Sequence, residues 1–337
     1  MTLKLSVLDQ SPVRSGATPA DALNETVQLA QAADRLGFER YWLAEHHATD
    51  GLAGASPEIL IGRVAGATKH IRVGSGGVML SHYSPLKVAE NFKLLETMYP
   101  GRIDCGIGRA PGSDGLTAAA LAYGSPIGIE YFPAKVADLR AFLTDTKPVT
   151  EAFARIRATP KTDNAPDLWL LGSSDSSAAL AARLGIAFSF AHFINGEGGV
   201  EIVNFYRTQY EPSDFAPAPR ANICLFAICA ETMEKANYYA KSRNLWRVQL
   251  ERGRLGKYPS PEEADAWDYT PAERARIAER SASHVIGTPE MVKAGIQDAA
   301  DRYGVDEVMV LTICHDFSAR VRSYELIADA FGLKPRS

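Results

Sequence analysis

The sequence contains no long hydrophobic run. Its longest uninterrupted apolar stretch covers residues 223–230, far fewer than the roughly 20 residues that a membrane-spanning helix needs. Residues 1–12 lack the apolar core and the small-residue cleavage site of a signal peptide. These absences predict a cytoplasmic protein that does not bind a membrane.

Cysteine is scarce, with four residues in a chain of 337, and none of the four forms a Cys-x-x-Cys pair. The sequence therefore predicts neither a disulfide scaffold nor a zinc site, and we expect no bound metal. An excess of positive charge is also missing, because 36 Lys and Arg are set against 40 Asp and Glu. Without a net positive field to attract phosphate backbones, nucleic acid is not an expected partner.

No Gly-x-Gly-x-x-Gly motif follows the first expected strand, which disfavours an open dinucleotide-binding sheet. Instead, short apolar runs alternate with amphipathic helical windows. Eight strands, each followed by a helix, are expected over residues 3–8, 41–44, 71–80, 103–107, 168–171, 187–190, 222–230 and 307–313. Parallel pairing with right-handed crossovers follows, and eight repeats fit a closed (β/α)8 TIM barrel of the α/β class. We expect residues 1–337 to form this single domain; a doubly wound open sheet is the alternative.

Two segments interrupt the alternation. Residues 147–167 and residues 251–283 each contain three prolines, and the second segment is also highly charged. Proline removes a backbone donor and clashes with a continuing helix, so clustered prolines indicate loops. We expect the first segment to be an irregular insertion and the second to be a mobile one.

Enzymes with this fold act at the carboxyl ends of the barrel strands. Polar or glycine-rich segments follow most of the expected strands, at Asp9, Glu45-His46-His47, Gly74–Gly77, Gly108-Arg109, Gly172–Ser177, His192 and His315. The sequence therefore places candidate chemistry where a barrel active site needs it.

The Glu45-His46-His47 string has two interpretations. One histidine transfers a proton or hydrogen-bonds a cofactor ring; because neighbouring side chains point in different directions, only one of the two is expected to face the mouth. The alternative is a metal pair or a helix-capping histidine, and the metal is disfavoured because no third ligand has a recognisable spacing.

Glycines and serines mark two further candidate surfaces. Gly76 and Gly77 interrupt an apolar strand, which indicates either close approach of a flat ligand to bare backbone or tight packing inside the barrel. The string Gly172-Ser173-Ser174-x-Ser176-Ser177 lies between a strand and a helix, where hydroxyls and free N–H groups favour a phosphate, with Arg109 nearby. Plain N-capping by serine is the alternative there.

Several of these motifs resemble those of the bacterial luciferase-like flavin monooxygenases. Residues 41–47, Tyr-Trp-Leu-Ala-Glu-His-His, resemble the family's second-strand motif, and residues 73–78 resemble its third strand. Residues 101–109 and 170–174 are similar to its fourth and fifth repeats. The resemblance spans residues 3 to about 192, returns at 286–290, and is closest to the single-chain luciferase-like oxidoreductases of unknown substrate.

The resemblance implies a (β/α)8 barrel that binds reduced FMN and forms a homodimer. By that resemblance Gly76 and Gly77 carry the flavin ring, over a non-prolyl cis peptide, and Asn91 faces the ring. His46 is the implied acid/base residue. The implied phosphate-binding residues are Arg109, Ser173, Ser174 and Ser177.

The implied reaction is a monooxygenation. Reduced FMN comes from a separate flavin reductase and reacts with oxygen, and a small organic substrate is oxidised while the protein excludes water. The lid is expected to be the 251–283 segment or the 110–129 loop. Two departures qualify the resemblance: Gly108 stands where the luciferases have a reactive cysteine, and Asp175 places a negative charge among the serines.

Three alternatives share these residues. A deazaflavin-dependent dehydrogenase on the same barrel would transfer hydride without oxygen. A non-catalytic flavin-binding protein would hold the cofactor without turnover. In a protein with no flavin, the glycine and serine clusters would be ordinary bulges and caps.

Overall fold

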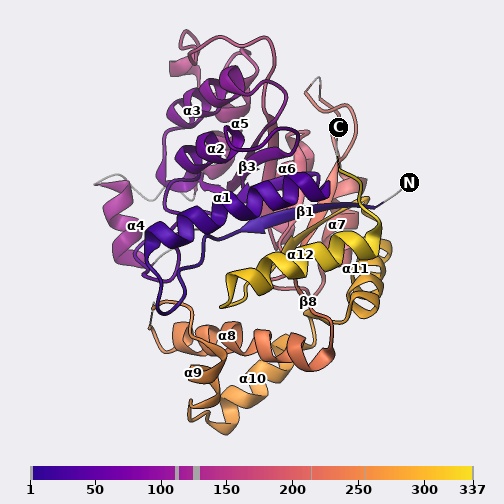
Figure 1. Ribbon diagram of the computed structural model, residues 1–337. Helices are drawn as coiled ribbons and strands as arrows, with labels where there is room; N and C mark the ends of the chain where they lie inside the picture. The colour runs from indigo at the N-terminus through magenta and orange to yellow at the C-terminus, as the bar shows by residue number, and fades with distance from the viewer. Residues whose placement is uncertain (1–2, 111–113, 124–129, 214, 255, 336–337) are drawn as a thin grey trace.

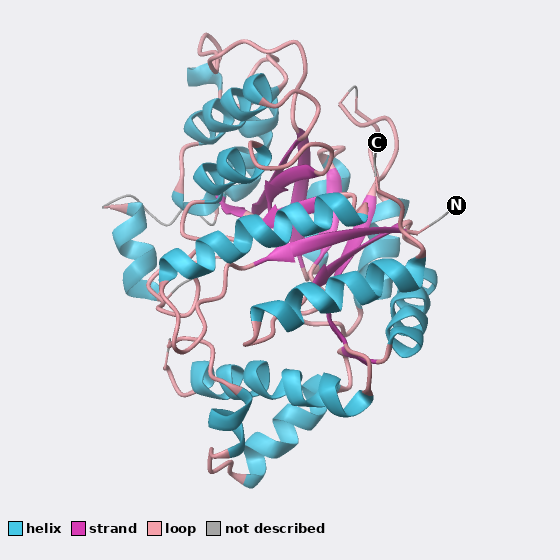
Figure 2. Ribbon diagram, viewed as in Figure 1, coloured by secondary structure: helices cyan, strands magenta, loops and turns pink. Residues whose placement is uncertain are grey.

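The computed structural model describes residues 3–335 apart from 111–113, 124–129, 214 and 255. Parallel strands form a closed barrel at its centre (Figures 1 and 2). The barrel strands are β1 (Lys4–Asp9), β2 (Arg40–Leu43), β3 (Arg72–Ser75), β4 (Val78–Met79), β5 (Ile103–Gly108), β6 (Asp167–Gly172), β7 (Ala187–Phe190), β8 (Ala221–Cys229) and β10 (Glu307–Leu311). Strand β10 closes the barrel because it pairs with both β1 and β8. The predicted (β/α)8 barrel is confirmed.

Helices surround the barrel, and Figure 2 shows them as an outer layer around the strands. They are α1 (Pro19–Leu36), α2 (Pro57–Ala65), α3 (Pro85–Met98), α5 (Phe132–Leu143), α6 (Asp175–Arg183), α7 (Gly199–Thr208), α11 (Pro289–Tyr303) and α12 (Phe317–Phe331). Four of them begin at a proline that follows Thr or Ser, since proline fits the first helical turn, where no N–H is needed. No helix in the described part of the chain is apolar and long enough to cross a membrane.

Alternate residues of each strand face two different environments. In β1, Leu5 and Val7 pack outward in the core between strands and helices, while Leu8 belongs to the second cluster inside the barrel. In β5, Cys105 lies in the outer core and Gly108 lines the barrel mouth, as their sequence parity predicts. Because side chains alternate along each strand, one side of the strand supplies the core that stabilises the fold and the other side supplies residues of the barrel interior and its mouth.

A buried ionic network fills the amino-terminal end of the barrel. Arg40 of β2 donates to Asp104 of β5 at 2.9 Å and to Glu307 of β10 at 3.0 Å. Arg72 of β3 also pairs with Asp104, which is fully buried. Burial alone raises the pKa of Asp104, but the two arginines outweigh burial and hold this pKa below its usual value. The network links strands from opposite sides of the barrel.

The expected third strand, residues 71–80, is divided in two. Strands β3 and β4 flank a cis peptide bond between Gly76 and Gly77, as the family resemblance implies. The backbone approaches its neighbour closely here: a Cβ atom on Gly106 would lie 2.0 Å from the carbonyl oxygen of Ser75. Glycine is required at that contact because any side chain would collide with the adjacent strand.

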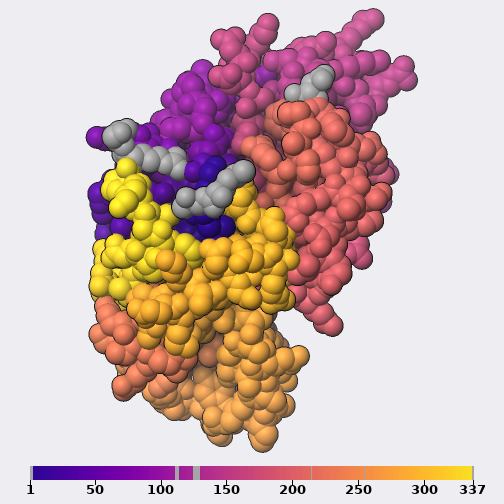
Figure 3. Space-filling view, turned by 90° about the vertical axis from the view of Figure 1, so that its right-hand side faces the viewer, coloured from indigo at the N-terminus to yellow at the C-terminus, as the bar shows by residue number. Residues whose placement is uncertain are grey.

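Residues 251–283 contain regular helices where their prolines indicate loops. They contain α9 (Pro261–Asp265) and α10 (Pro271–Ser281), and each of these helices begins with a capping box followed by its proline. The prolines therefore start helices rather than break them. Together with α8 (Met233–Glu251), these helices form a lobe, which we call the α8–α10 lobe; it lies apart from the ring of outer helices in Figure 1 and projects at the bottom of Figure 3.

The structure agrees with some of the predictions for the other irregular segments and differs from the rest. Residues 147–167 contain only a single 3₁₀ turn, Glu151–Phe153, so their predicted irregular structure is confirmed. A short strand, β9 (Val285–Gly287), was not expected and pairs with the far end of β8 beyond the barrel. The expected 110–129 loop contains the helix α4 (Gly115–Ala122), and much of the rest of this loop lies outside the described residues.

Replacement of Asp104 by Asn tests the ionic network. The substitution removes the fully buried carboxylate that Arg40 and Arg72 share and leaves them only Glu307 and the more distant Asp167, so we expect it to lower the free energy of unfolding by about 3–5 kcal/mol. Urea denaturation at neutral pH measures the loss. Asp298→Asn is the matched control: its exposed pair with Arg302 should contribute less than about 0.5 kcal/mol. A loss as small as the control's in Asp104→Asn would contradict the structural role of the network.

Candidate active site at the carboxyl end of the barrel

A cavity of about 750 Å³ opens at the carboxyl ends of the strands. Its walls come from the segments that follow six of the strands and from residues inside others, so the barrel itself brings them together. The lining includes most of the residues that the sequence singled out, namely His46, Gly76, Gly77, Arg109, Ser173, Ser174 and Ser177. It also includes residues that the sequence pattern did not single out, among them Gln10, Met79, Phe193, Ile194, Cys224 and Met309.

One wall of the cavity is bare backbone. Gly76 and Gly77 face it from the junction of β3 and β4, and Gly108 faces it from the end of β5. No atom lies within 4 Å of the position that a Cβ on Gly108 would take, so the backbone is open toward the cavity there. At Gly76 and Gly77 a Cβ would instead collide with Leu8 and with the backbone of Gly106, so tight packing inside the barrel also requires these two glycines. A flat, uncharged surface can therefore lie against the strands at this point.

His46 follows β2 and lines the cavity. Its backbone N–H donates to the carbonyl of Gly54 at 2.9 Å, which fixes the chain here. Burial, with a smaller contribution from His47, lowers the pKa of His46 to about 4. The Nδ1 atom is buried and has no partner among the described residues. His46 is therefore a neutral imidazole at pH 7 with one ring nitrogen available.

His47 points into a different network, as the alternation of neighbouring side chains predicts. Its Nε2 atom lies 2.7 Å from Glu45, whose other oxygen accepts from the backbone N–H of Met79 at 2.9 Å. The Tyr83 hydroxyl donates to Glu45 at 2.6 Å, and burial together with this carboxylate raises the pKa of Tyr83. Glu45 thus joins the loop after β2 to β4 and positions His46 beside it.

The serine cluster surrounds the first turn of α6. Ser174 is the N-cap residue, but its hydroxyl does not cap the helix; it lies 3.2 Å from the hydroxyl of Ser177. A Cβ atom on Gly172 would lie 2.5 Å from the Ser177 Oγ atom, so only glycine allows this hydroxyl to approach the strand end. Asp175 is exposed and does not line the cavity, so its charge points away from the serines.

Two candidate residues lie elsewhere. Asn91 is on α3, outside the lining of the cavity, and hydrogen-bonds the carboxylate of Glu58. Asp9 ends β1 but is fully buried, where Arg320 pairs with it at 2.7 Å and Tyr41 donates to it at 2.5 Å. Asp9 therefore anchors α12 to the barrel, and its carboxylate is already occupied.

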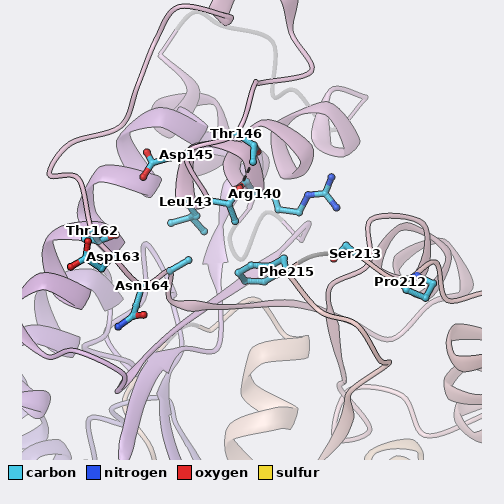
Figure 4. Close-up of a pocket in the computed structure, with 12 residues that line it drawn as sticks. Arg140, Leu143, Asp145, Thr146, Thr162, Asp163, Asn164, Pro212, Ser213 and Phe215 are labelled. Carbon is cyan, nitrogen blue, oxygen red and sulfur yellow. Dashed lines mark hydrogen bonds between the residues drawn. The ribbon is translucent and has the colours of Figure 1, made fainter.

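A separate hollow of about 590 Å³ lies near the opposite end of the barrel, at the amino ends of the strands. Figure 4 shows Asp163 and Asn164 on one side of it and Phe215 and Ser213 on the other. These residues come from the segments that lead into β6 and β8, at the amino ends of the strands. Barrel enzymes hold their reacting groups at the carboxyl ends, so we assign the active site to the cavity that contains His46.

The chain belongs to the luciferase-like monooxygenase family, whose sequence model matches residues 1–307. It is 45% identical to the uncharacterized protein YwcH of Bacillus subtilis, over 98% of this chain and 99% of that one. It is 38% identical to the N-acetyl-S-alkylcysteine monooxygenase of the same organism, over 97% of this chain and 98% of the relative. The match covers the whole barrel, and the chain is accordingly a member of a monooxygenase family.

Solved structures agree with the fold. The crystal structure of apo-MsnO8 is 40% identical, with a TM-score of 0.90 and coverage of 99% of this chain and 100% of that one. The oxygenating constituent of 3,6-diketocamphane monooxygenase from Pseudomonas putida, solved with FMN, has a TM-score of 0.69 at 18% identity, over 99% and 100% of the two chains. A secondary alcohol dehydrogenase that uses F420 has a TM-score of 0.71 at 16% identity, over the full length of both chains. The last two show only that the fold is shared.

The pH dependence of stability tests the burial of His46. In the unfolded chain its pKa is near 6.5, whereas the folded value is about 4. The unfolded state therefore binds the proton first, so the contribution of His46 to stability is complete above pH 6.5 and falls as the pH decreases toward 4. We expect His46→Gln to reduce the loss of unfolding free energy between pH 7 and pH 5 by about 1–2 kcal/mol.

Urea denaturation at the two pH values measures this difference, with His70→Gln, at an exposed histidine, as the control. An identical pH dependence in His46→Gln and in the unmodified protein would show that His46 titrates normally.

Proposed function

We propose that the protein is an FMN-dependent monooxygenase that uses reduced FMN and oxygen to oxidise a small organic substrate. The observation that carries the proposal is the combination found in one cavity: a backbone wall of glycines, a hydroxyl-rich helix start and a neutral buried histidine. The glycine wall suits a flat ring, the hydroxyl-rich helix start suits a phosphate, and the neutral histidine suits a proton-transfer step. The membership of a monooxygenase family supports the same conclusion.

The residues fit FMN at both ends. The ring would lie against Gly76 and Gly77, where side chains are absent. The phosphate would bind at the first turn of α6 through the hydroxyls of Ser174 and Ser177, neither of which caps the helix. The helix dipole and free N–H groups favour an anion there. We include Ser173 and Arg109 in the phosphate site because both line the same end of the cavity.

When bound, reduced FMN would supply the electrons that activate oxygen. The side chains of this protein have three tasks around that chemistry. The Leu8, Leu171 and Met309 side chains, with other apolar groups, exclude water from the cavity. Glu45 holds the segment that carries His46. His46, neutral and unpaired at Nδ1, accepts or returns a proton beside the ring.

FMN is preferred over a deazaflavin because a full-length relative at 38% identity is named a monooxygenase, whereas the F420 enzyme is similar only in fold. A reaction that consumes reduced FMN needs a flavin reductase as a partner. We further propose a homodimer of single-domain subunits in the cytoplasm, with the α8–α10 lobe as the cover of the mouth.

Arg109→Ala tests the phosphate site. Loss of a charged hydrogen bond should weaken the binding of reduced FMN by about 1.5–3 kcal/mol, or roughly 10- to 100-fold. Anaerobic calorimetric titration measures the dissociation constant. Arg183→Ala is the control, because Arg183 is exposed at the other end of α6. Unchanged FMN affinity in Arg109→Ala would remove this residue from the site, and binding of F420 in place of FMN would favour the dehydrogenase.

His46→Ala separates catalysis from binding. Because His46 is assigned to proton transfer and not to holding the phosphate, the variant should bind reduced FMN within about threefold of the unmodified protein. Its oxygen-dependent turnover should fall by about 100-fold or more, the usual worth of general acid/base catalysis. Stopped-flow mixing of the reduced FMN complex with oxygen and substrate measures the rate. Full turnover in His46→Ala would exclude the proposed role.

A further inference from the structure

A second cavity, of about 640 Å³, adjoins the proposed flavin site. Gln10, His46, Phe193 and Ile194 line both cavities, so they form the shared wall. The far side of the second cavity belongs to α8 and to the chain that follows it. A molecule in this cavity would therefore lie between the α8–α10 lobe and the face of the first cavity that carries His46.

Two arginines of α8 line the second cavity without a carboxylate partner. Arg243 and Arg247 are four residues apart and hence lie on one face of the helix. Arg243 is only 6% exposed; its guanidinium stacks on Phe226, 3.8 Å from the ring centre, and donates to His284 at 3.1 Å. Among the described residues no ion pair forms with either arginine, although a buried cation is normally paired.

Neighbouring arginines do have carboxylate partners. Arg280 of α10 pairs with Glu251, and Arg320 pairs with Asp9. These carboxylates are therefore not available to the two arginines of α8. Burial lowers the pKa of Arg243 to about 10; the adjacent Tyr258 opposes this shift, and the positive charges of Arg247 and Arg280 add smaller lowering effects. Arg243 is still charged at neutral pH, and the cavity carries excess positive charge.

The surroundings of these arginines are rich in donors that lack acceptors. The Nε atom of Arg247 and the hydroxyl of Tyr258, which also lines the cavity, are buried and unpaired in the part of the chain that the structure describes. His284 cannot supply a negative charge: burial and the adjacent arginines lower its pKa to about 3, and its Nε2 atom already accepts from Arg243. Buried donors that have no acceptor in the protein favour the binding of an anion.

One acidic side chain also lines the cavity, and it offsets only one of the two positive charges. Asp114 is exposed, and its two oxygens accept from the backbone N–H and the hydroxyl of Thr117, where it caps α4. The remaining lining is largely apolar, with Leu52, Trp246, Leu250 and Leu311. Trp246 stacks on Tyr258 at 4.6 Å, which holds the phenol ring in place.

We propose that the second cavity is the substrate site and that it selects substrates bearing a carboxylate, bound by Arg243 and Arg247 with the Tyr258 hydroxyl. The planar fork of a guanidinium matches the two oxygens of a carboxylate. The apolar part of the substrate packs on Trp246 and Phe193, which directs its other end to the shared wall at His46. The substrate assignment rests on the proposed function, whereas the carboxylate-binding site does not.

Binding to the protein without flavin tests the carboxylate site separately from the monooxygenase. Hexanoate serves as the probe, with methyl hexanoate as its uncharged equivalent, and quenching of tryptophan fluorescence follows binding because Trp246 lines the cavity. We expect hexanoate to bind at least tenfold more tightly than the ester. Arg243→Met and Arg247→Met should each weaken hexanoate binding about tenfold or more and leave ester binding unchanged.

Lys235→Met is the matched control, since Lys235 lies on the same helix but is 57% exposed, and it should bind hexanoate as the unmodified protein does. Arg243→Lys retains the charge and reports on the site if Arg243→Met does not fold. Equal binding of acid and ester, unchanged binding in the arginine variants, or tighter binding of inorganic phosphate than of hexanoate would overturn the proposal. Hexanoate binding with no affinity for reduced FMN would contradict the proposed function alone.

Discussion

The ionic network around Arg40 is the contact on which the rest of the molecule depends. It joins β2, β5 and β10 across the amino-terminal end of the barrel. The indole N–H of Trp42 also donates to the carboxylate of Asp104 in this network, at 2.9 Å. Trp42 in turn packs edge-on against Trp169, which fills the next layer of the interior. Ions and large aromatic rings fill the interior at this end, and the first cavity lies at the other end, where glycines and small side chains line the mouth.

The mouth contains two kinds of surface that complement each other. The first cavity presents hydroxyls, bare backbone and the neutral His46, with Glu45 and Arg109 as its charged lining residues. The second presents two arginines without carboxylate partners on α8, and the two cavities meet at a common wall. The loop after β1 fixes the second cavity to the barrel, because Tyr258 exchanges backbone hydrogen bonds with Val13 and Ser15. The α8–α10 lobe is therefore part of the site.

The sequence predicted what depends on local pattern. Short apolar runs predicted the eight barrel strands, and the polar and glycine-rich segments after them predicted many of the residues that line the first cavity. It did not predict α9 and α10, because Pro261 and Pro271 indicate loops unless the capping residues before them are considered. The second cavity was missed for a different reason: whether Arg243 has a partner depends on three-dimensional packing that spacing cannot reveal.

Asn91 shows the limit of a family resemblance in the same way. Its place near the flavin was expected from the family resemblance, whereas in the structure it lies toward Glu58.

The most direct test of the whole account is a crystal structure of the protein with FMN. The account predicts the ring against Gly76 and Gly77 and the phosphate at the first turn of α6. A phosphate bound at the arginines of α8, or a flavin in the hollow at the amino ends of the strands, would contradict it.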